Sequence, residues 1–568
     1  MLKIKSILVS LLAIATLASC SDENDNSLGG GDEKGYDVAY MSISLSVPKG
    51  PQTRASGEEP AVGTESDINT LYVVTFGSDE KVVKDKDGDF ATVLGSGAIG
   101  TVSGVTTPNT PVKVSTNTTY LLVIANPGAV LAKRLEDLTA SDTYTSIISL
   151  LEIPTKDEPT NAYIVDEVVH SGGYTMINVG FFDDSDPSSA NHAWKAKCLL
   201  DVSSNIILAS DYKTDAAAQA AAKDNPAKLE IERLAAKLEV TVASSLKVAP
   251  FKDGDENQSL GQFTFEKWAI DHYNSHLFPY AEKNVTKSSH SASTPFYKSN
   301  FYTKDPNYDE TGGVKGYLAG IVKNELNTTT LEPKVDWIDK SNSFGNNYKY
   351  CTENTMAADY QKFGAATRLV LRAQYVPGPA SDGFELGKDW FYLSNGADSK
   401  TFATFDALLA VYNPAKLKDE GDRTALEKRL VNACDLFYDQ IKGKLTSSPS
   451  NFAALTQDIL DEITAYGGEL TKVDGCLYWY QKSINYYYYE IRHDNEANEH
   501  MQFGKYGVVR NNYYMLNLTK VNGQGTPWYP GDGPEDPKEE EDIDKLGAFL
   551  HFEIEVAPWI KWETDFEI

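Results

Sequence analysis

A glycine-rich segment is the first pattern in the chain that could do chemistry, by holding the phosphates of a nucleotide. Residues 95–100, "GSGAIG", match the glycine spacing of dinucleotide-binding loops. Such a loop should lead into a helix, but the residues that follow include Gly104, Pro108 and Pro111. We therefore predict a hairpin turn here rather than a nucleotide site.

Three aspartates have the spacing of the first ligands in a calcium-binding loop: Asp85, Asp87 and Asp89. Phe90 stands where that loop needs a glycine, and Ser96 stands where it needs a bidentate glutamate. Because both requirements fail, the segment is predicted to be a solvated turn.

Two pairs of histidines have spacings that resemble those of zinc ligands. His272 and His276 are four residues apart, and His493 and His500 flank Glu496. Neither pair has both a glutamate base and a third ligand, so surface loops are expected. The chain also lacks a GxSxG nucleophile elbow. We predict no metal, no cofactor and no catalytic residue, and hence no enzyme.

Four consecutive tyrosines, residues 486–489, could offer a surface on which sugars stack. Neighbouring residues of a strand point to opposite faces, so at most two of these rings can lie on one side. Packing within a sheet is the expected use.

The first element that could position a functional surface is a strand over residues 37–47. Four apolar side chains alternate with serines in it: Met41, Ile43, Leu45 and Val47. This period of two predicts a half-buried strand that ends at Pro48. A polar loop follows, and it carries Arg54, the first arginine of the chain.

The last residues of the chain form a second strand pattern. Four apolar side chains alternate with charged or polar ones: Ile560, Trp562, Phe566 and Ile568. No turn or returning strand follows, so this strand has no partner nearby in the sequence.

Between these ends, the pattern predicts a mainly β protein with two β-sandwiches in tandem. Short strand patterns separated by turn residues occupy residues 36–225 and again residues 226–547, with the expected boundary at Pro226 after an alanine-rich segment. Helical patterns between residues 401 and 468 predict insertions in the second sandwich. An acidic, proline-rich linker then leads to residues 548–568, the expected C-terminal strands.

The first residues predict an exported protein. Residues 1–19 have a basic start, a short apolar stretch and small residues at the end, which is typical of a signal peptide. "LASC" resembles a bacterial lipobox and makes Cys20 the expected lipid-bearing residue, followed by a flexible tether over residues 20–35. Removing residues 1–19 takes away two lysines and changes the formal charge from -29 to -31. A chain this acidic repels nucleic acid.

The remaining four cysteines are widely spaced: Cys198, Cys351, Cys434 and Cys476. They form no CxxC pair and no disulfide framework. One or two bridges and free buried thiols both remain open.

The two terminal strands suggest a mechanism when they are considered together. If the first strand fills a groove in the N-terminal sandwich, cleavage in the loop at Arg54 lets it leave and exposes unpaired backbone. The last strand of a second molecule could then occupy the groove. Because groove and strand lie at different places on the protein, the contact is head-to-tail, and its repetition gives a filament.

Several segments of the chain resemble the major fimbrial subunits, or shaft pilins, of the type V pili of Bacteroidetes. These segments are "LASC", "MSISLSVPKGPQTRA", "LEIERLAAKLEV", "YGVVRNNYYMLNLTKV" and "FEIEVAPW". The resemblance implies two transthyretin-like β-sandwich domains, export as an outer-membrane lipoprotein, and assembly by strand exchange into a surface fimbria that serves adhesion.

Carried over by position, the resemblance implies cleavage between Arg54 and Ala55 by an arginine-specific protease and displacement of the strand that carries Met41, Ile43, Leu45 and Val47. The donor residues would be Ile560, Trp562, Phe566 and Ile568 of another copy. Further expected partners are accessory anchor and tip pilins and a surface receptor. Two alternatives remain open, a membrane-held lipoprotein that binds glycan near residues 478–489, and an anchor or tip subunit of the same pilus.

Overall fold

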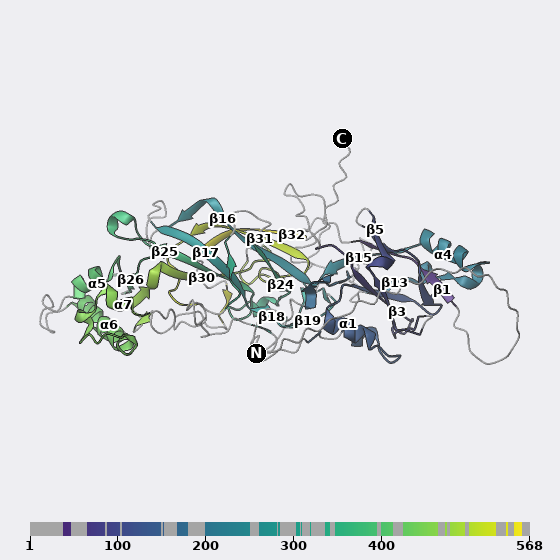
Figure 1. Ribbon diagram of the computed structural model, residues 1–568, viewed down its shortest axis with the longest axis horizontal. Coiled ribbons are helices and arrows are strands. Elements are labelled where there is room, and N and C mark those ends of the chain that lie inside the picture. The colour runs from purple at the N-terminus through teal and green to yellow at the C-terminus, as the bar shows by residue number, and fades with distance from the viewer. Residues whose placement is uncertain are drawn as a thin grey trace, which may run out of the picture. The chain divides into compact units, whose positions relative to one another are not determined.

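Strands in several sheets make up most of the described structure, with few helices (Figure 1). The computed structural model describes residues 38–46, 65–85, 88–102, 105–148, 151–152, 167–179, 199–249, 261–280, 282–283, 303–306, 308, 318–319, 335–340, 347–394, 399–412, 424–463, 472–473, 477–494, 499–529, 541–543 and 550–558. The predicted mainly β class is confirmed.

Two sheets form the N-terminal region and share a buried apolar core. The larger sheet has the strand order β4 (Ala91–Gly95), β3 (Thr70–Phe76), β8 (Tyr120–Ala125), β12 (Met176–Asn178), β15 (Ala227–Arg233), β2 (Ile43–Ser46), β6 (Val105–Pro108) and β5 (Ile99–Val102), and β13 (Leu200–Asp201) also pairs with β8. The smaller sheet has the order β14 (Ile207–Leu208), β1 (Val38–Met41) and β7 (Val112–Ser115).

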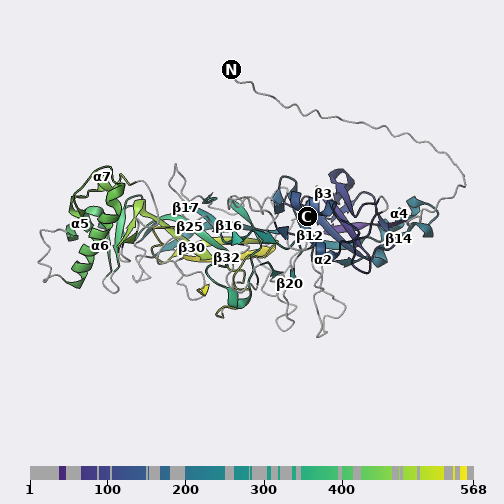
Figure 2. The same cartoon turned by 90° about the horizontal axis from the view of Figure 1, so that it is seen from below.

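Two four-stranded sheets form the C-terminal region around a second core. One has the order β24 (Tyr348–Thr352), β16 (Ala235–Val248), β31 (Asn512–Val521) and β32 (Leu550–Pro558). The other has the order β23 (Ile338–Asp339), β17 (Gln262–Asp271), β25 (Arg368–Val376) and β30 (Ile484–Glu490). Both β16 and β32 are visible in Figure 2, where β17, β25 and β30 lie side by side.

The chain passes from the N-terminal to the C-terminal sheets between Arg233 and Ala235. Strand β15 pairs with β2 and β12, whereas β16 pairs with β24 and β31. This change of sheets comes after Pro226, the boundary expected from the sequence, because β15 is needed to complete the first sheet.

A third core belongs to the helical insertion. A sheet of β27 (Lys400–Phe402), β26 (Trp390–Leu393), β29 (Leu477–Tyr480) and β28 (Lys472–Val473) packs against α5 (Phe405–Tyr412), α6 (Ala425–Ile441) and α7 (Gln457–Leu460). Helix α6 begins at a capping box, in which Thr424 accepts from the Glu427 N–H while the Glu427 carboxylate accepts from the Thr424 N–H. The predicted helices between residues 401 and 468 are therefore present.

Shorter elements complete the described part of the chain. The helices are α1 (Ala129–Glu136), α2 (Tyr144–Ile147) and α4 (Asp215–Asp224). The short strand pairs are β10 (Val169–His170) with β11 (Gly173–Tyr174), β18 (Tyr273–Asn274) with β22 (Leu318–Ala319), β19 (His276–Leu277) with β9 (Leu151–Glu152), and β20 (Glu282–Lys283) with β21 (Thr303–Lys304).

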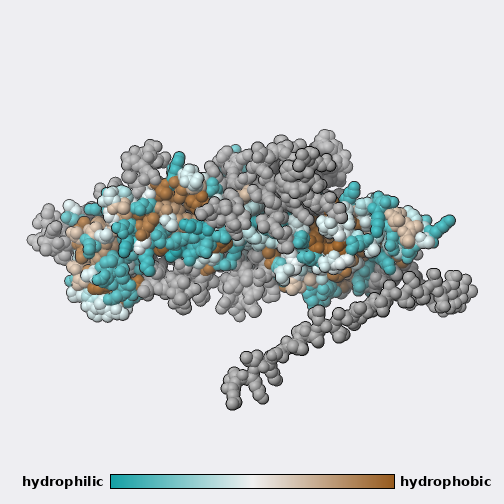
Figure 3. Space-filling model, turned by 45° about the horizontal axis from the view of Figure 1, so that its top comes forward, coloured by the Kyte–Doolittle hydropathy of each residue, from teal (hydrophilic) through white to brown (hydrophobic). Residues whose placement is uncertain are grey.

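The surface, the helices and the cysteines give three further observations. Hydrophilic and hydrophobic side chains are interspersed over the described part of the face in Figure 3. Within the described ranges, no helix is both long enough and apolar enough to cross a membrane. Cys351 and Cys434 are buried, while Cys198 and Cys476 lie outside the described residues.

Candidate assembly site

The first described strand is enclosed on both sides. Antiparallel β7 and β14 flank β1, whereas β2 lies between parallel β15 and antiparallel β6. Met41 faces Val112 in the ladder with β7, and Leu45 faces Leu229 in the ladder with β15. The strand thus contributes backbone hydrogen bonds to both N-terminal sheets.

The strand changes sheets at Ser42. The carbonyl of Ser42 accepts a hydrogen bond of 2.8 Å from the Ala227 N–H, and the pairing moves from β7 and β14 to β15 and β6 around this residue. Pairing in two sheets means that removing one short segment would leave an open slot in each of them.

Three of the predicted strand residues are deeply buried. Met41 and Ile43 are 0% exposed and Leu45 is 1% exposed, and all three belong to the N-terminal core. Fully burying side chains of this size stabilises a fold by about 1.5–3 kcal/mol each. The fourth predicted residue, Val47, lies outside the described residues.

The second face of β1 is covered as well, which no pattern in the sequence indicated. Tyr40 is 1% exposed and packs with Ala218 and Ala222 of α4. Helix α4 begins at Thr214, whose side chain accepts from the Ala217 N–H. The alanine-rich segment, expected only to interrupt the strands, therefore forms part of the wall around the first strand.

Residues 65 and 66, where the described chain resumes after residue 46, form a buried anchor. The Glu65 carboxylate accepts from Lys237 Nζ at 3.0 Å and from the Tyr350 hydroxyl at 2.6 Å. The Glu65 carbonyl accepts from Arg233 Nε at 2.8 Å, and the Ser66 hydroxyl accepts from the same guanidinium at 2.9 Å. Glu65 is 1% exposed, so charge pairing and burial together hold this segment.

Arg233 connects this anchor to the start of β31. Its guanidinium donates to Asn511 Oδ1 at 3.1 Å, and the Asn511 N–H donates to the Ala235 carbonyl at 2.8 Å. Burial lowers the pKa of Arg233 to about 10, although the nearby Glu65 carboxylate opposes that change. The guanidinium still carries its charge at neutral pH.

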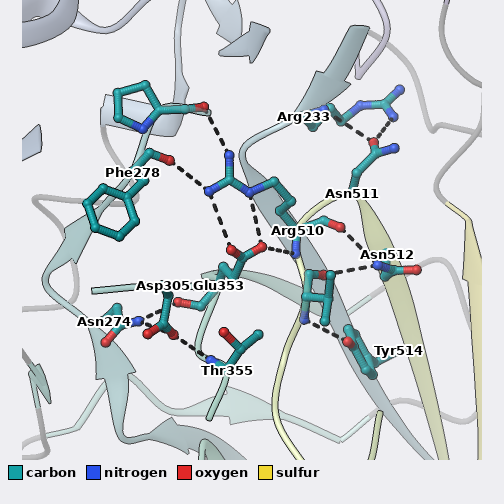
Figure 4. A network of polar contacts seen from close by, with 12 residues as sticks. Arg233, Asn274, Phe278, Asp305, Glu353, Thr355, Arg510, Asn511, Asn512 and Tyr514 are labelled. Atoms are coloured by element: carbon teal, nitrogen blue, oxygen red, sulfur yellow. Dashed lines mark hydrogen bonds and ion pairs between the residues drawn. The ribbon is translucent and has the colours of Figure 1, made fainter. Parts of the chain in front are cut away.

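A second buried arginine fixes the turn before β31 (Figure 4). Arg510 donates to Glu353 Oε2 through Nε at 3.0 Å and through its backbone N–H at 3.1 Å. The same guanidinium donates to the carbonyls of Phe278 and Pro279 at 2.7 and 3.0 Å. At the lower left of Figure 4, Asn274 extends the network by donating to the Glu353 carbonyl at 2.7 Å.

The C-terminal strand β32 is paired on one side only among the described residues. It runs antiparallel to β31 from Asn512 opposite Pro558 to Val521 opposite Leu550. The predicted donor residues Ile560, Trp562, Phe566 and Ile568 follow it and lie outside the described residues, as do Cys20, Arg54 and Ala55.

The glycine-rich segment at residues 95–100 and the described aspartates at residues 85 and 89 contribute to turns in the structure. Gly95 ends β4, and residues Ser96–Ala98 form a single tight turn before β5. The predicted hairpin is wrong, because β4 pairs with β3 whereas β5 pairs with β6. Asp85 Oδ1 accepts from the Asp89 N–H at 2.9 Å within a turn, while Asp87 lies outside the described residues.

The prediction of surface loops was wrong for two of the histidines. His276 is 6% exposed because β19 pairs with β9, and His493 is 3% exposed and bonded to the Tyr514 hydroxyl at 2.8 Å. In the part of the chain that the structure describes, no group of three or more His, Cys, Asp or Glu residues could hold a metal.

The tyrosine run lies in β30 as sheet packing predicts. Tyr486 and Tyr487 are buried, and their two neighbours are half-buried. These rings are therefore not an open platform for sugars.

The fold is mainly β, its first described strand is enclosed, and β32 lies at the edge of its sheet among the described residues. The family described as "Major fimbrial subunit protein (FimA)" matches residues 39–180, and the one described as "Major fimbrial subunit protein type IV, Fimbrillin, C-terminal" matches residues 478–565. The first match includes β2 and all of β1 except Val38, and the second match includes β32. The resemblance to major fimbrial subunits is confirmed, since the chain is similar to two parts of such subunits over these ranges.

Solved structures of low identity also align with most of the chain. A protein from Parabacteroides distasonis described as a candidate cell adhesion protein is 14% identical, covers 92% of this chain and 99% of its own, and has a TM-score of 0.37. A fimbrilin from Porphyromonas gingivalis is 12% identical, with 92% and 98% coverage and a TM-score of 0.35. The tip fimbrial protein Mfa3 from the same species is 9% identical, with 92% and 100% coverage and a TM-score of 0.30. The assignment rests on the two family matches, and no curated protein matches the chain.

Proposed function

We propose that the protein is a shaft subunit of a surface fimbria that polymerises head-to-tail by exchanging its first strand for the last strand of another copy. The observation that supports this proposal most is the enclosed position of β1 and β2. Met41, Ile43 and Leu45 fill the N-terminal core, yet they belong to a segment that is joined to the rest through residues 47–64 and Arg54.

Release of the strand would create an acceptor. The strands β7, β14, β15 and β6 would each lose a partner, and the core would lose three buried apolar side chains. An incoming strand with the same alternation, such as the one that carries Ile560, Trp562, Phe566 and Ile568, would replace both kinds of interaction. Association costs about 4–15 kcal/mol, so side chains and backbone pairing must act together.

The Glu65 anchor would set how much of the chain leaves. Cleavage after Arg54 would give a new N-terminus at Ala55, ten residues before Glu65. The hydrogen bonds of Glu65 and Ser66 to Arg233 and Lys237 involve no residue of the first strand, so the mature chain would stay attached at this point. Upstream of the cleavage site, the released piece would include the lipid-bearing Cys20 of an outer-membrane precursor.

The experiment treats the purified precursor with an arginine-specific protease, sequences the new N-terminus and images the product. The expected result is a terminus at Ala55 and filaments from the full chain, with no filaments from a chain lacking residues 559–568. Arg54→Ala should stay uncleaved at this position and monomeric, whereas the control Arg134→Ala should assemble. Filaments that form from the truncated chain, or from uncleaved Arg54→Ala, would refute strand exchange.

A further inference from the structure

A pocket of about 570 Å³ lies where the helical insertion meets the C-terminal sheets. Four segments that are distant in the sequence line it: residues 383–389 before β26, residues 403–406 at the start of α5, residues 457–463 around α7, and residues 479–482 at the end of β29. Helices α5 and α7 can be located at the left of Figure 2. This volume is in the range of sites for small molecules.

The pocket has an apolar base and a charged rim. Trp479, Phe405 and Leu460 line it and are at most 1% exposed, so they belong to the insertion core. The side chains of Lys388 and Asp406 are exposed at the rim.

Asp389 holds three of the four segments together. Its carboxylate accepts from Trp479 Nε1 at 2.8 Å, from the Lys482 N–H at 2.8 Å and from Gln457 Nε2 at 3.2 Å. Because one carboxylate fixes three walls, the pocket is formed before any ligand arrives.

The turn at Lys482, which borders the pocket, has positive φ angles at two residues. Lys482 and Ser483 are consecutive non-glycine residues with φ of 49° and 60°. The Ser483 hydroxyl donates to the Lys388 carbonyl at 2.6 Å, which keeps this turn in place. Strained backbone of this kind is typical of ligand-binding segments.

Gln481 supplies a separate indication of a ligand. It lines the pocket and is 5% exposed, and its side-chain oxygen has no hydrogen-bond partner among the described residues. A buried amide oxygen without a partner is costly, so a donor from outside the chain would stabilise it.

We propose that this pocket binds a saccharide. Hydroxyl groups both donate and accept hydrogen bonds, and the lining offers both kinds of partner, with lysine donors, carboxylate acceptors and the amides of Gln457 and Gln481. A wholly apolar ligand would leave these groups unpaired, and an anion would meet Asp406 and Asp461. The pocket and the tyrosine run of β30 are different surfaces, and binding here does not depend on strand exchange.

The test applies the full chain to an array of immobilised neutral and amino-sugar oligosaccharides and measures the affinity for the best-bound glycan in solution. Asp406→Ala and Gln481→Leu should each weaken binding about tenfold or more, since each removes one polar partner. The control Asp458→Ala changes an exposed aspartate of the same insertion that does not line the pocket, and it should leave affinity within about twofold.

Three outcomes would overturn the proposal. In the first, the folded chain binds no glycan on the array. In the second, none of the pocket variants changes the affinity. In the third, the chain binds a polylysine peptide but no saccharide. Asp406 is exposed, so its variant tests the site even if Gln481→Leu fails to fold. Filament formation by the same variants separates this result from strand exchange, because a pocket variant should polymerise as the unaltered chain does.

Discussion

The first and last described strands of the protein are held in opposite ways. Strands β1 and β2 are short, have a partner on each side and bury Met41, Ile43 and Leu45. Strand β32 is longer, and its only partner among the described residues is β31. The first strand therefore completes a core that would be open without it, whereas the last described strand forms the edge of its sheet among the described residues.

Deleting the two ends one at a time should give the largest difference between the two strands. Removal of residues 1–46 takes away about 5–9 kcal/mol of side-chain burial, which is comparable to the whole stability of a domain. We expect hydrogen exchange in β3, β8 and β15 to lose its protection and ANS to bind. Removal of residues 550–568 should leave those strands protected.

A peptide of residues 38–46 provides the control for the first deletion. Added to the chain that lacks residues 1–46, it should restore protection in the N-terminal sheets, because it carries both halves of the missing strand. Protection that survives the deletion would show that the first strand does not complete the core.

The C-terminal region should instead depend on buried charge. Arg510→Met leaves the Glu353 carboxylate buried without its cation, and breaking such a pair costs about 3–5 kcal/mol. The loss should appear as a lower denaturation midpoint in fluorescence, since Trp268, Trp390 and Trp528 lie in the C-terminal core. The control Lys442→Met breaks an exposed pair with Asp439 and should leave the denaturation midpoint nearly unchanged.

A matched pair of small substitutions sharpens the comparison between the two cores. Ile43→Val and Ile491→Val each remove one methylene group from a side chain that is 0% exposed, at a cost of about 0.5–1.5 kcal/mol. Hydrogen exchange should show the first loss in the N-terminal sheets and the second in the C-terminal sheets. An equal loss in both regions for either variant would mean that the two cores unfold as one unit.

In the helical insertion, the carboxylate of Glu462 holds residues 446 and 447 by hydrogen bonds. This attachment is weaker than burial of a strand or of an ion pair. The backbone N–H of Ser447 and the hydroxyl of Thr446 hold the pKa of Glu462 at about 2, below its ordinary value of 4.5. A lowered carboxylate pKa stabilises the fold above pH 4.5, and this stabilisation is lost as the pH falls towards 2.

Glu462→Gln should therefore make residues 445–463 slightly more sensitive to proteolysis at pH 7. The variant and the unaltered chain should also differ in the hydrogen exchange of this segment at pH 7. That difference should be smaller near pH 2.5, where the carboxylate is being protonated. A difference of the same size at both pH values would show that the charge of Glu462 has no part in holding this segment.

The sequence predicted local features of the fold well. The alternation at Met41, Ile43 and Leu45 identified a strand with one buried face, and the helical periods identified α5 and α6. Both patterns depend on neighbours within a few residues, which is the range that periodicity reports.

Features that depend on distant pairing could not be predicted. Burial of His276 follows from the pairing of β19 with β9, and the anchor at Glu65 requires Arg233 and Lys237 from strands far along the chain. The change of sheets at Ser42 likewise requires β15. A charged or polar residue gives no local sign that it will be buried, and only the register of remote strands decides it.

The parallel pairing of β2 with β15 also constrains the order in which the chain can fold. Ile43 and Leu45 are synthesised early, but their partners Ala227 and Leu229 come much later. The ladder cannot close until that long intervening segment exists, and contacts of such high sequence separation form slowly. The first apolar strand must therefore remain unpaired with β15 while most of the N-terminal region is synthesised, which makes this interval the period of greatest risk for aggregation.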